Sequence, residues 1–261
     1  MRSYRDTGYI LKTRPLGEAD RLVIVFSKNH GKIEAVAKGA RKPLSRKAGN
    51  IDLLNLVNFA FHKGKNLDIV TEAELVDDFD VLKRDLPTIS EIFYILELLD
   101  RFLSVDLDSK LIYKTLQNFL TLMSQSGYKN SALMLGLELK LLDYLGFGPD
   151  LTSCLHCGQQ LKEDVARIAA SKGMAGYLCS EHFNTLDYPE TTVSNTVIKL
   201  QRLLLSKSLG LIKSIKINLQ LENRVKSIQD SWIRGILEAD LKSLMFLEEV
   251  RTKHGNRRKK G

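Results

Sequence analysis

The chain has 261 residues, of which 44% are hydrophobic and 27% charged, and its formal net charge is +8. This length exceeds the ~100 to 200 residues usual for one domain, so we expect two compact domains. No run of ~18 apolar residues occurs and the first residues lack the apolar centre of a signal peptide. A membrane-spanning or secreted class is therefore unsupported, and we expect a cytoplasmic protein.

Cations are concentrated at the two ends of the chain. Residues 1–65 hold 14 Lys and Arg against 5 acids, residues 251–261 hold 6 against none, and the middle holds 19 against 26. Two basic ends therefore flank an acidic body. Because affinity for a polyanion depends on several cations that meet successive phosphates, this asymmetry indicates a nucleic acid as the partner.

The first 80 residues predict a small antiparallel barrel. Short turns separate five β-type runs, at residues 8–13, 22–26, 32–37, 53–61 and 67–75. A polar connection that contains Gly64 joins the last two runs, as in many hairpins. The one long connection, residues 38–50, is also the most basic segment.

Beyond Pro87 the apolar period changes from two to about 3.6, which indicates helices. Thr88 followed by Glu91 is a capping-box pattern, so we expect a helix to begin there. Further helical stripes cover residues 112–123, 197–204 and 225–236, and residues 133–145 are apolar nearly all round, as expected for a helix buried on most sides. The fold class predicted from these patterns is α+β: a five-stranded barrel, then a helical body that carries an inserted cysteine segment.

The cysteine segment has the spacing of a metal site. Two pairs, Cys154 with Cys157 and Cys179 with His182, each enclose two residues. Thiolates and imidazoles in fours are the ligands of tetrahedral zinc, and four protein ligands leave no position for substrate. We therefore expect structural Zn²⁺. His156 is an alternative fourth ligand, and an empty site or redox use of the thiols are alternatives to bound zinc.

Cations on the long connection are candidates for binding a polyanion. Lys38, Arg41, Lys42, Arg46 and Lys47 lie around a proline with no acid among them. The alternative is that they are ordinary solvated surface residues. More cations would extend the surface if they share its face: Arg14, Arg21, Lys63 and Lys65.

Aromatic and acidic residues of the barrel allow two further interpretations. Tyr9, Phe26, Phe59 and Phe61 could stack on unpaired bases, but packing in the core is the favoured interpretation. The acids between Glu72 and Asp80 could hold magnesium for phosphodiester cleavage, but no His or Lys accompanies them as a base. Phosphate-binding loops, dinucleotide turns and nucleophile elbows are absent from the sequence, so we expect no enzyme.

Several short motifs, in this order, resemble the RecO family of bacterial DNA repair proteins. The first four motifs lie at residues 8–12, at the turn from Gly17 to Asp20, at residues 30–32 and at residues 37–42 with Ser45. Residues 73–75 and residues 146–151, which lead into Cys154, continue the likeness over nearly the whole length.

The resemblance implies an OB-fold domain joined to a helical domain with a zinc module. Family members bind single- and double-stranded DNA, anneal complementary strands, and help RecR, with or without RecF, load RecA onto strands coated by single-strand-binding protein. Carried over, DNA binding falls on Lys38, Arg41 and Lys42, and less strongly on Arg46 and Lys47. The zinc ligands are then Cys154, Cys157, Cys179 and His182, where His182 departs from the four-cysteine version of the module.

On this basis the chain divides into five parts: an OB-fold DNA-binding domain at residues 1–80, helical parts at 81–149 and 191–250, a zinc-binding insertion at 150–190 and a basic disordered tail at 251–261. The tail could add DNA affinity or keep the end soluble. The alternative functions are an RNA-binding factor, since OB-type barrels with zinc modules also serve RNA, and a magnesium-dependent nuclease acting through residues 77–80.

Overall fold

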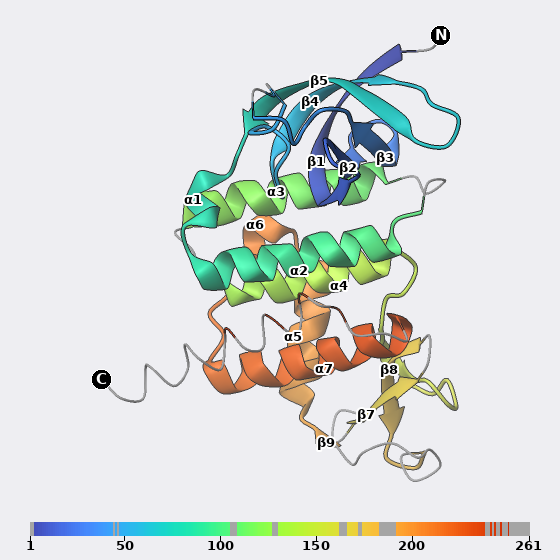
Figure 1. Cartoon of the computed structure of the whole chain (residues 1–261). Coiled ribbons are helices and arrows are strands. Elements are labelled where there is room, and N and C mark those ends of the chain that lie inside the picture. Colours follow the sequence, from blue (N-terminus) through green and yellow to red (C-terminus); the bar gives the residue numbers. More distant parts are fainter. Residues whose placement is uncertain are drawn as a thin grey trace. The chain divides into compact units, whose positions relative to one another are not determined.

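A computed structural model of the chain describes residues 3–43, 45, 47–104, 109–126, 130–161, 166–171, 174–182 and 192–237, with residues 241, 243, 246 and 250 (Figure 1). Its contacts form two compact units. The first runs to Gln117 and takes in the described residues from Leu241 onward, and the second runs from Asn118 to Asp240. The tail at residues 251–261 lies outside the described residues.

The first unit contains a closed barrel of five strands in the order β1-β2-β3-β5-β4 (Figure 1). All neighbours pair antiparallel except β3 and β5, which are parallel. The strands are β1 (Ser3–Leu16), β2 (Asp20–Ser27), β3 (Gly31–Ala37), β4 (Leu56–His62) and β5 (Asp68–Asp77). This arrangement confirms the predicted five-stranded OB-type barrel.

Inward-facing and outward-facing residues alternate along the barrel strands, and the inward-facing ones form the barrel core. Val23, Val25, Val57, Phe59 and Phe61 are among its fully or almost fully buried residues. Ile51 joins this core from outside the strands, and Leu54 is also completely buried. The predicted strand at residues 53–61 therefore begins only at Leu56, and Leu54 before it is buried in irregular chain.

Helices of the first unit follow the barrel. They are α1 (Asp80–Lys83), α2 (Leu86–Phe102) and the first part of α3 (Lys110–Ser126). The Asp85 side chain accepts a hydrogen bond from the Thr88 backbone N–H, so α2 begins two residues before the predicted start at Thr88. Within this unit, Lys12 of β1 and Lys32 of β3 both reach the Asp100 carboxylate of α2, at 2.8 and 3.1 Å.

The second unit surrounds the helix α4 (Ser131–Tyr144), which is buried on most sides as its uniform apolarity predicts. It contacts α5 (Asn195–Ser206), α6 (Leu209–Ile212) and α7 (Leu219–Leu237). A buried ion pair joins Glu138 of α4 to Lys226 of α7. The predicted helical body is therefore confirmed for these residues.

A four-stranded sheet lies between α4 and α5 in the sequence, in the order β6-β8-β7-β9. Its strands are β6 (Asp150–Cys154), β7 (Ala166–Ser171), β8 (Met174–Cys179) and β9 (Thr192–Val193). Tyr177 of β8 and Trp232 of α7 meet edge to face, with ring centroids 5.5 Å apart. This contact fixes the sheet on the helices of its own unit. Among the described residues, no helix is long and apolar enough to cross a membrane.

Candidate nucleic-acid interface and metal centre

The basic loop, residues 38–47, starts where β3 ends. Its first turn exposes the side chains of Lys38, Arg41 and Lys42. Gly39 has a φ of +66°, which a residue without Cβ adopts at little cost, and the Lys42 N–H donates to the Gly39 carbonyl at 3.1 Å. The three exposed cations therefore lie on one compact turn.

The turn between β1 and β2 holds this loop in place. The Asp20 carboxylate accepts a 2.8 Å hydrogen bond from the Gly39 N–H. Arg41 donates its backbone N–H to the Ala19 carbonyl at 2.9 Å and its Nη1 to the Gly17 carbonyl at 2.9 Å. The cations are thus presented from a fixed backbone, which lowers the entropy lost when an extended ligand binds.

The other predicted cations of this loop and its surroundings are placed differently. Lys47 is half-buried and donates Nζ to the Val70 carbonyl at 2.8 Å, and Arg21 donates to the Ile51 carbonyl at 3.0 Å. Arg46 lies outside the described residues. Lys63 and Lys65 belong to the β4–β5 loop, which precedes β5, whereas the basic loop follows its parallel neighbour β3. They therefore lie at the other end of this strand pair and extend no common surface with Lys38 (Figure 1).

Asp20 and Gly17 position the basic loop, and sequence reasoning assigned them no such role. Both belong to the turn motif on which the family resemblance rests. Their place in that turn motif was the signal available for them. The partner of Asp20 was not predictable, because its hydrogen bond with Gly39 joins residues 19 positions apart.

The barrel's aromatic side chains are buried, as favoured from the sequence. Tyr9 and Phe26 are 1% and 0% exposed, and their rings lie 5.3 and 5.5 Å from that of Tyr113 in α3. Phe59 and Phe61 lie in the barrel core. Phe26 of β2 is thus covered by α3 of the same unit, whereas Glu34 of β3 is exposed.

The acids that could have formed a nuclease centre have other partners. Glu72 pairs with Arg5 at 2.6 Å, and Asp80 pairs with Arg84 one helical turn later. Among the described residues, the one grouping of three or more His, Cys, Asp or Glu side chains able to hold a metal ion lies elsewhere, in the cysteine segment. The structure therefore gives the nuclease alternative no assembled metal site in its described part.

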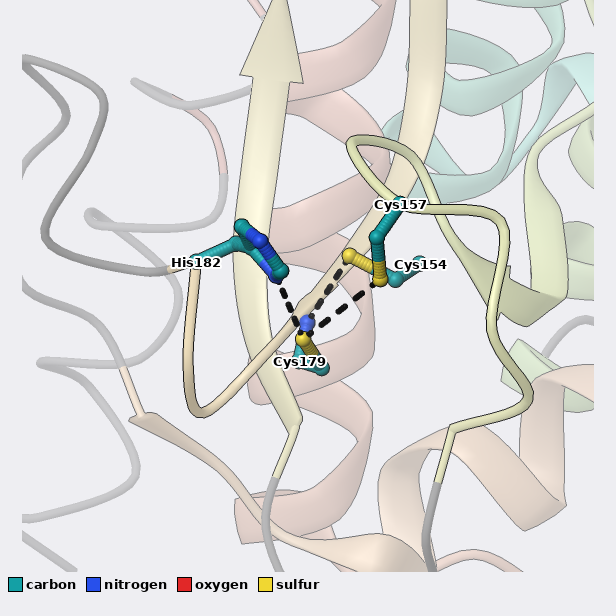
Figure 2. A group of neighbouring side chains, drawn as sticks. All are labelled: Cys154, Cys157, Cys179 and His182. Atoms are coloured by element: carbon teal, nitrogen blue, oxygen red, sulfur yellow. Dashed lines mark hydrogen bonds between the residues drawn. The ribbon is translucent and has the colours of Figure 1, made fainter.

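In the cysteine segment two turns converge (Figure 2). The first follows β6 and is closed by a 2.9 Å hydrogen bond from the Gly158 N–H to the Cys154 carbonyl. The second follows β8 and is closed by a 3.1 Å hydrogen bond from the His182 N–H to the Cys179 carbonyl. One ligand atom from each of Cys154, Cys157, Cys179 and His182 lies within 4.8 Å of the others. These residues are the four predicted from the sequence.

The donor set fits a tetrahedral metal ion. Zn–S bonds of about 2.3 Å place two thiolates of a tetrahedron roughly 3.8 Å apart, and Cys157 and Cys179 have their Sγ atoms 4.0 Å apart. Burial raises the pKa of Cys154, but backbone N–H donors led by that of Cys179 outweigh it and lower the pKa to about 7. Because the thiolate is the form that binds metal, the lowered pKa favours the metal-binding form of Cys154.

His182, not His156, completes the group. The Nδ1 of His182 lies 3.0 Å from the Cys179 Sγ. The ring of His156 lies beside that of His182 in a tilted arrangement, with centroids 4.5 Å apart and planes inclined by 32°. His156 therefore neighbours the fourth ligand.

Comparison with known proteins decides the family. The family model "Recombination protein O N terminal" matches residues 1–79, and "Recombination protein O C terminal" matches residues 83–245. The chain belongs to the RecO family. The first match ends just before α1 and the second begins at its last residue, so the basic loop lies in the N-terminal match. The Cys3His group, which consists of Cys154, Cys157, Cys179 and His182, lies in the C-terminal match.

Two curated RecO relatives cover nearly the whole chain. The DNA repair protein RecO of Desulforamulus reducens is 31% identical over 251 residues, which are 96% of this chain and 96% of that protein. The DNA repair protein RecO of Roseiflexus sp. is 34% identical over 250 residues, 96% of this chain and 87% of that protein. The sequence resemblance is therefore confirmed along both units.

Proposed function

We propose that the chain is a DNA-binding recombination mediator that anneals complementary strands. The observation that carries this proposal is the turn that exposes Lys38, Arg41 and Lys42 from a backbone fixed by Asp20. Three cations on one turn can meet successive phosphates of a single or a double strand. Arg46 and Lys47 are weaker members of the same interface, since Lys47 contacts the Val70 carbonyl.

Annealing requires no bond to be made or broken in DNA, in keeping with a protein that is not an enzyme. Two strands repel because both are polyanions. A protein that neutralises phosphates on both strands raises their local concentration and reduces that repulsion, after which base pairing supplies the driving force. We further propose that the chain works with RecR, with or without RecF, to load RecA onto strands coated by single-strand-binding protein, as family membership implies.

Structural Zn²⁺ is the cofactor that we propose for the Cys3His group. Four protein ligands saturate a tetrahedral ion, so the metal would join the turns after β6 and β8 and take no part in chemistry. Three thiolates favour zinc over the hard cations, which prefer oxygen ligands.

The test is annealing of complementary oligonucleotides coated with single-strand-binding protein. The variant Lys38→Ala/Arg41→Ala/Lys42→Ala is compared with wild type and with a charge-matched control in the second unit, Lys199→Ala/Lys207→Ala/Lys216→Ala, whose side chains are also exposed. Loss of three phosphate contacts should weaken DNA binding by about a hundredfold at ~0.15 M salt and slow annealing accordingly. Equal annealing by the two triple variants would contradict the proposal.

A matched comparison separates DNA repair from the RNA-binding alternative. Binding is measured to DNA and RNA oligonucleotides of one sequence, both single-stranded and duplex. Contacts to phosphates alone predict similar affinities for the two, while a role in repair excludes a strong RNA preference. A preference for RNA of a hundredfold or more would support the alternative.

A further inference from the structure

Four aromatic rings run in contact from the barrel core to its surface. Phe59 and Phe61 lie in the core with ring centroids 5.1 Å apart. Tyr4 stacks on Phe61 at 5.1 Å, and His30 lies beside Tyr4 at 4.6 Å. Tyr4 is half-buried, and the His30 side chain is 47% exposed. The series therefore ends in an imidazole that faces solvent.

The His30 ring is held in place by a buried carboxylate. Asp6, only 6% exposed, accepts hydrogen bonds from the Asn29 N–H at 3.0 Å and from the Asn29 side chain at 2.8 Å. Its Oδ2 lies 2.7 Å from the His30 Nδ1, and the His30 N–H donates to the Ser27 hydroxyl at 3.1 Å. The turn between β2 and β3 thus presents the ring in one orientation, at little entropic cost to a partner that stacks on it.

Cations flank the exposed end of this series. The Lys63 Nζ lies 6.0 Å from the centroid of the Tyr4 ring. Lys63 and Lys65 are exposed on either side of Gly64, whose N–H donates to the Asp68 carboxylate at 3.2 Å. A Cβ on Gly64 would lie 1.9 Å from the Leu67 carbonyl oxygen, so this loop conformation requires glycine.

Two carboxylates near these groups, Asp68 and Asp6, are buried. Asp68 is 9% exposed and accepts a hydrogen bond from the Tyr4 hydroxyl, as well as the bond from Gly64. Asp6 is buried beneath His30 and Asn29. The exposed groups at this end include the His30 imidazole, part of the Tyr4 ring and the ammonium groups of Lys63 and Lys65.

We propose that Tyr4, His30, Lys63 and Lys65 form a second DNA contact, the ring site, which is selective for unpaired bases. A nucleobase stacks on the exposed His30 ring while Lys63 and Lys65 meet the flanking phosphates. Base stacking on an aromatic side chain needs an unstacked base, which a single strand offers and a duplex does not. The proposal rests on the proposed function, because it assumes that the barrel binds DNA.

The ring site and the basic loop divide the recognition between them. The β2–β3 turn and the β4–β5 loop precede the parallel strands β3 and β5, and the basic loop follows β3. The two contacts therefore lie at opposite ends of this strand pair, as Figure 1 also shows for the β4–β5 loop and the loop after β3. The basic loop binds phosphates of either form of DNA, and the ring site adds a preference for the unpaired form.

Affinities of His30 variants for a single strand and for a duplex test this proposal. His30→Ala should weaken binding of a 20-nucleotide single strand by between about fivefold and a hundredfold and leave duplex binding unchanged. His30→Phe, which keeps an aromatic face, should restore most of the loss. His62→Ala is the control, since this histidine lies at the end of β4 outside the ring series. Unchanged single-strand binding by His30→Ala would overturn the ring site.

Photo-crosslinking locates the contact in the wild-type protein, so the result does not depend on a variant's folding. A single strand substituted with 5-iododeoxyuridine is irradiated in complex, and the adduct is mapped by mass spectrometry. The ring site predicts an adduct on Tyr4 or His30. A bound strand that crosslinks only elsewhere would contradict the ring site yet leave DNA binding intact, whereas a wild-type protein that binds no DNA would remove the proposed function itself.

Discussion

Asp20 and Gly39 are joined by a 2.8 Å hydrogen bond from the Gly39 backbone N–H to the Asp20 carboxylate. The bond connects the start of β2 to the first turn of the basic loop. Arg41 strengthens the connection through the Gly17 and Ala19 carbonyls. An acid beside three exposed cations therefore acts on the loop's backbone, and we expect it to support DNA binding although it bears the same sign of charge as DNA.

A pair of substitutions at Asp20 separates its hydrogen bond from its charge. Asp20→Asn and Asp20→Ala both remove the negative charge, but only Asn keeps an oxygen that can accept from Gly39. We expect the Ala variant to bind DNA more weakly than the Asn variant and to lose about 1 kcal/mol of folding stability relative to it. The slope of log affinity against log salt should be equal in both, because the cations are unchanged. Identical affinities would show that the bond does not position the loop.

Asp100 is predicted to be critical to the first unit. The Asp100 carboxylate neutralises both Lys32 and Lys12. The side chain of Asp100 is 7% exposed and that of Lys32 is 14% exposed. Asp100→Ala would leave the Lys32 ammonium nearly buried without its counter-charge, so we expect a loss of about 3 kcal/mol in the free energy of unfolding. Lys12→Ala, which removes a half-exposed partner, should cost less than about 1 kcal/mol. Urea denaturation measures both values, and comparable losses would refute the asymmetry.

The same ion pairs predict how stability depends on pH. Burial raises the pKa of Asp100, but hydrogen bonds and charges of Lys12 and Lys32 outweigh it, so the net pKa is lowered. A carboxyl whose pKa is lower in the folded state contributes stability that is fully present above its unfolded pKa of about 3.9 and is lost as the pH falls through the folded value. The stability difference between wild type and Asp100→Asn should therefore be constant near neutral pH and shrink below about pH 4. A difference that grows with acid would contradict this assignment.

Metal binding by the Cys3His group is testable by substitution with cobalt. Tetrahedral Co²⁺ bound by thiolates absorbs visible light, so titration of the metal-free protein should give these bands at one equivalent. We expect zinc to displace cobalt and to raise the melting temperature, since metal binding to a preformed site stabilises the folded state. A protein that binds neither ion would exclude the metal centre.

Two histidine variants identify the fourth ligand. His182→Ala removes the group whose Nδ1 lies 3.0 Å from the Cys179 Sγ and should weaken metal binding and alter the cobalt spectrum. His156→Ala removes only the ring that lies beside His182 and should retain the spectrum of wild type. The reverse result would assign the ligand to His156.

Local patterns in the sequence predicted most elements, and non-local contacts account for the misses. The helices α3, α5 and α7 follow from their apolar stripes, and α4 follows from a run that is apolar nearly all round. The ligand spacing located the four residues of the metal group. The first strand was predicted at residues 8–13 but spans Ser3–Leu16, because its two halves pair with different partners, β4 and β2. No local signal reveals that second partner.

Loop residues account for the remaining differences between the predicted and the observed structure. Leu54 has a φ of +73° and is completely buried, so the start of an apolar run that predicts a strand is irregular chain. The contact of Lys47 with the Val70 carbonyl is equally invisible to charge counting. The domain boundaries and the DNA-binding residues drawn from the sequence stay predictions.

Salt dependence of DNA binding tests the central claim most directly. The slope of log affinity against log salt counts the phosphates that the protein neutralises. For Lys38→Ala/Arg41→Ala/Lys42→Ala we predict a slope flatter than that of wild type by roughly two to three units, and for Lys199→Ala/Lys207→Ala/Lys216→Ala a slope equal to that of wild type. An unchanged slope in the first variant, or equal flattening in both, would show that the basic loop is not the surface that contacts DNA.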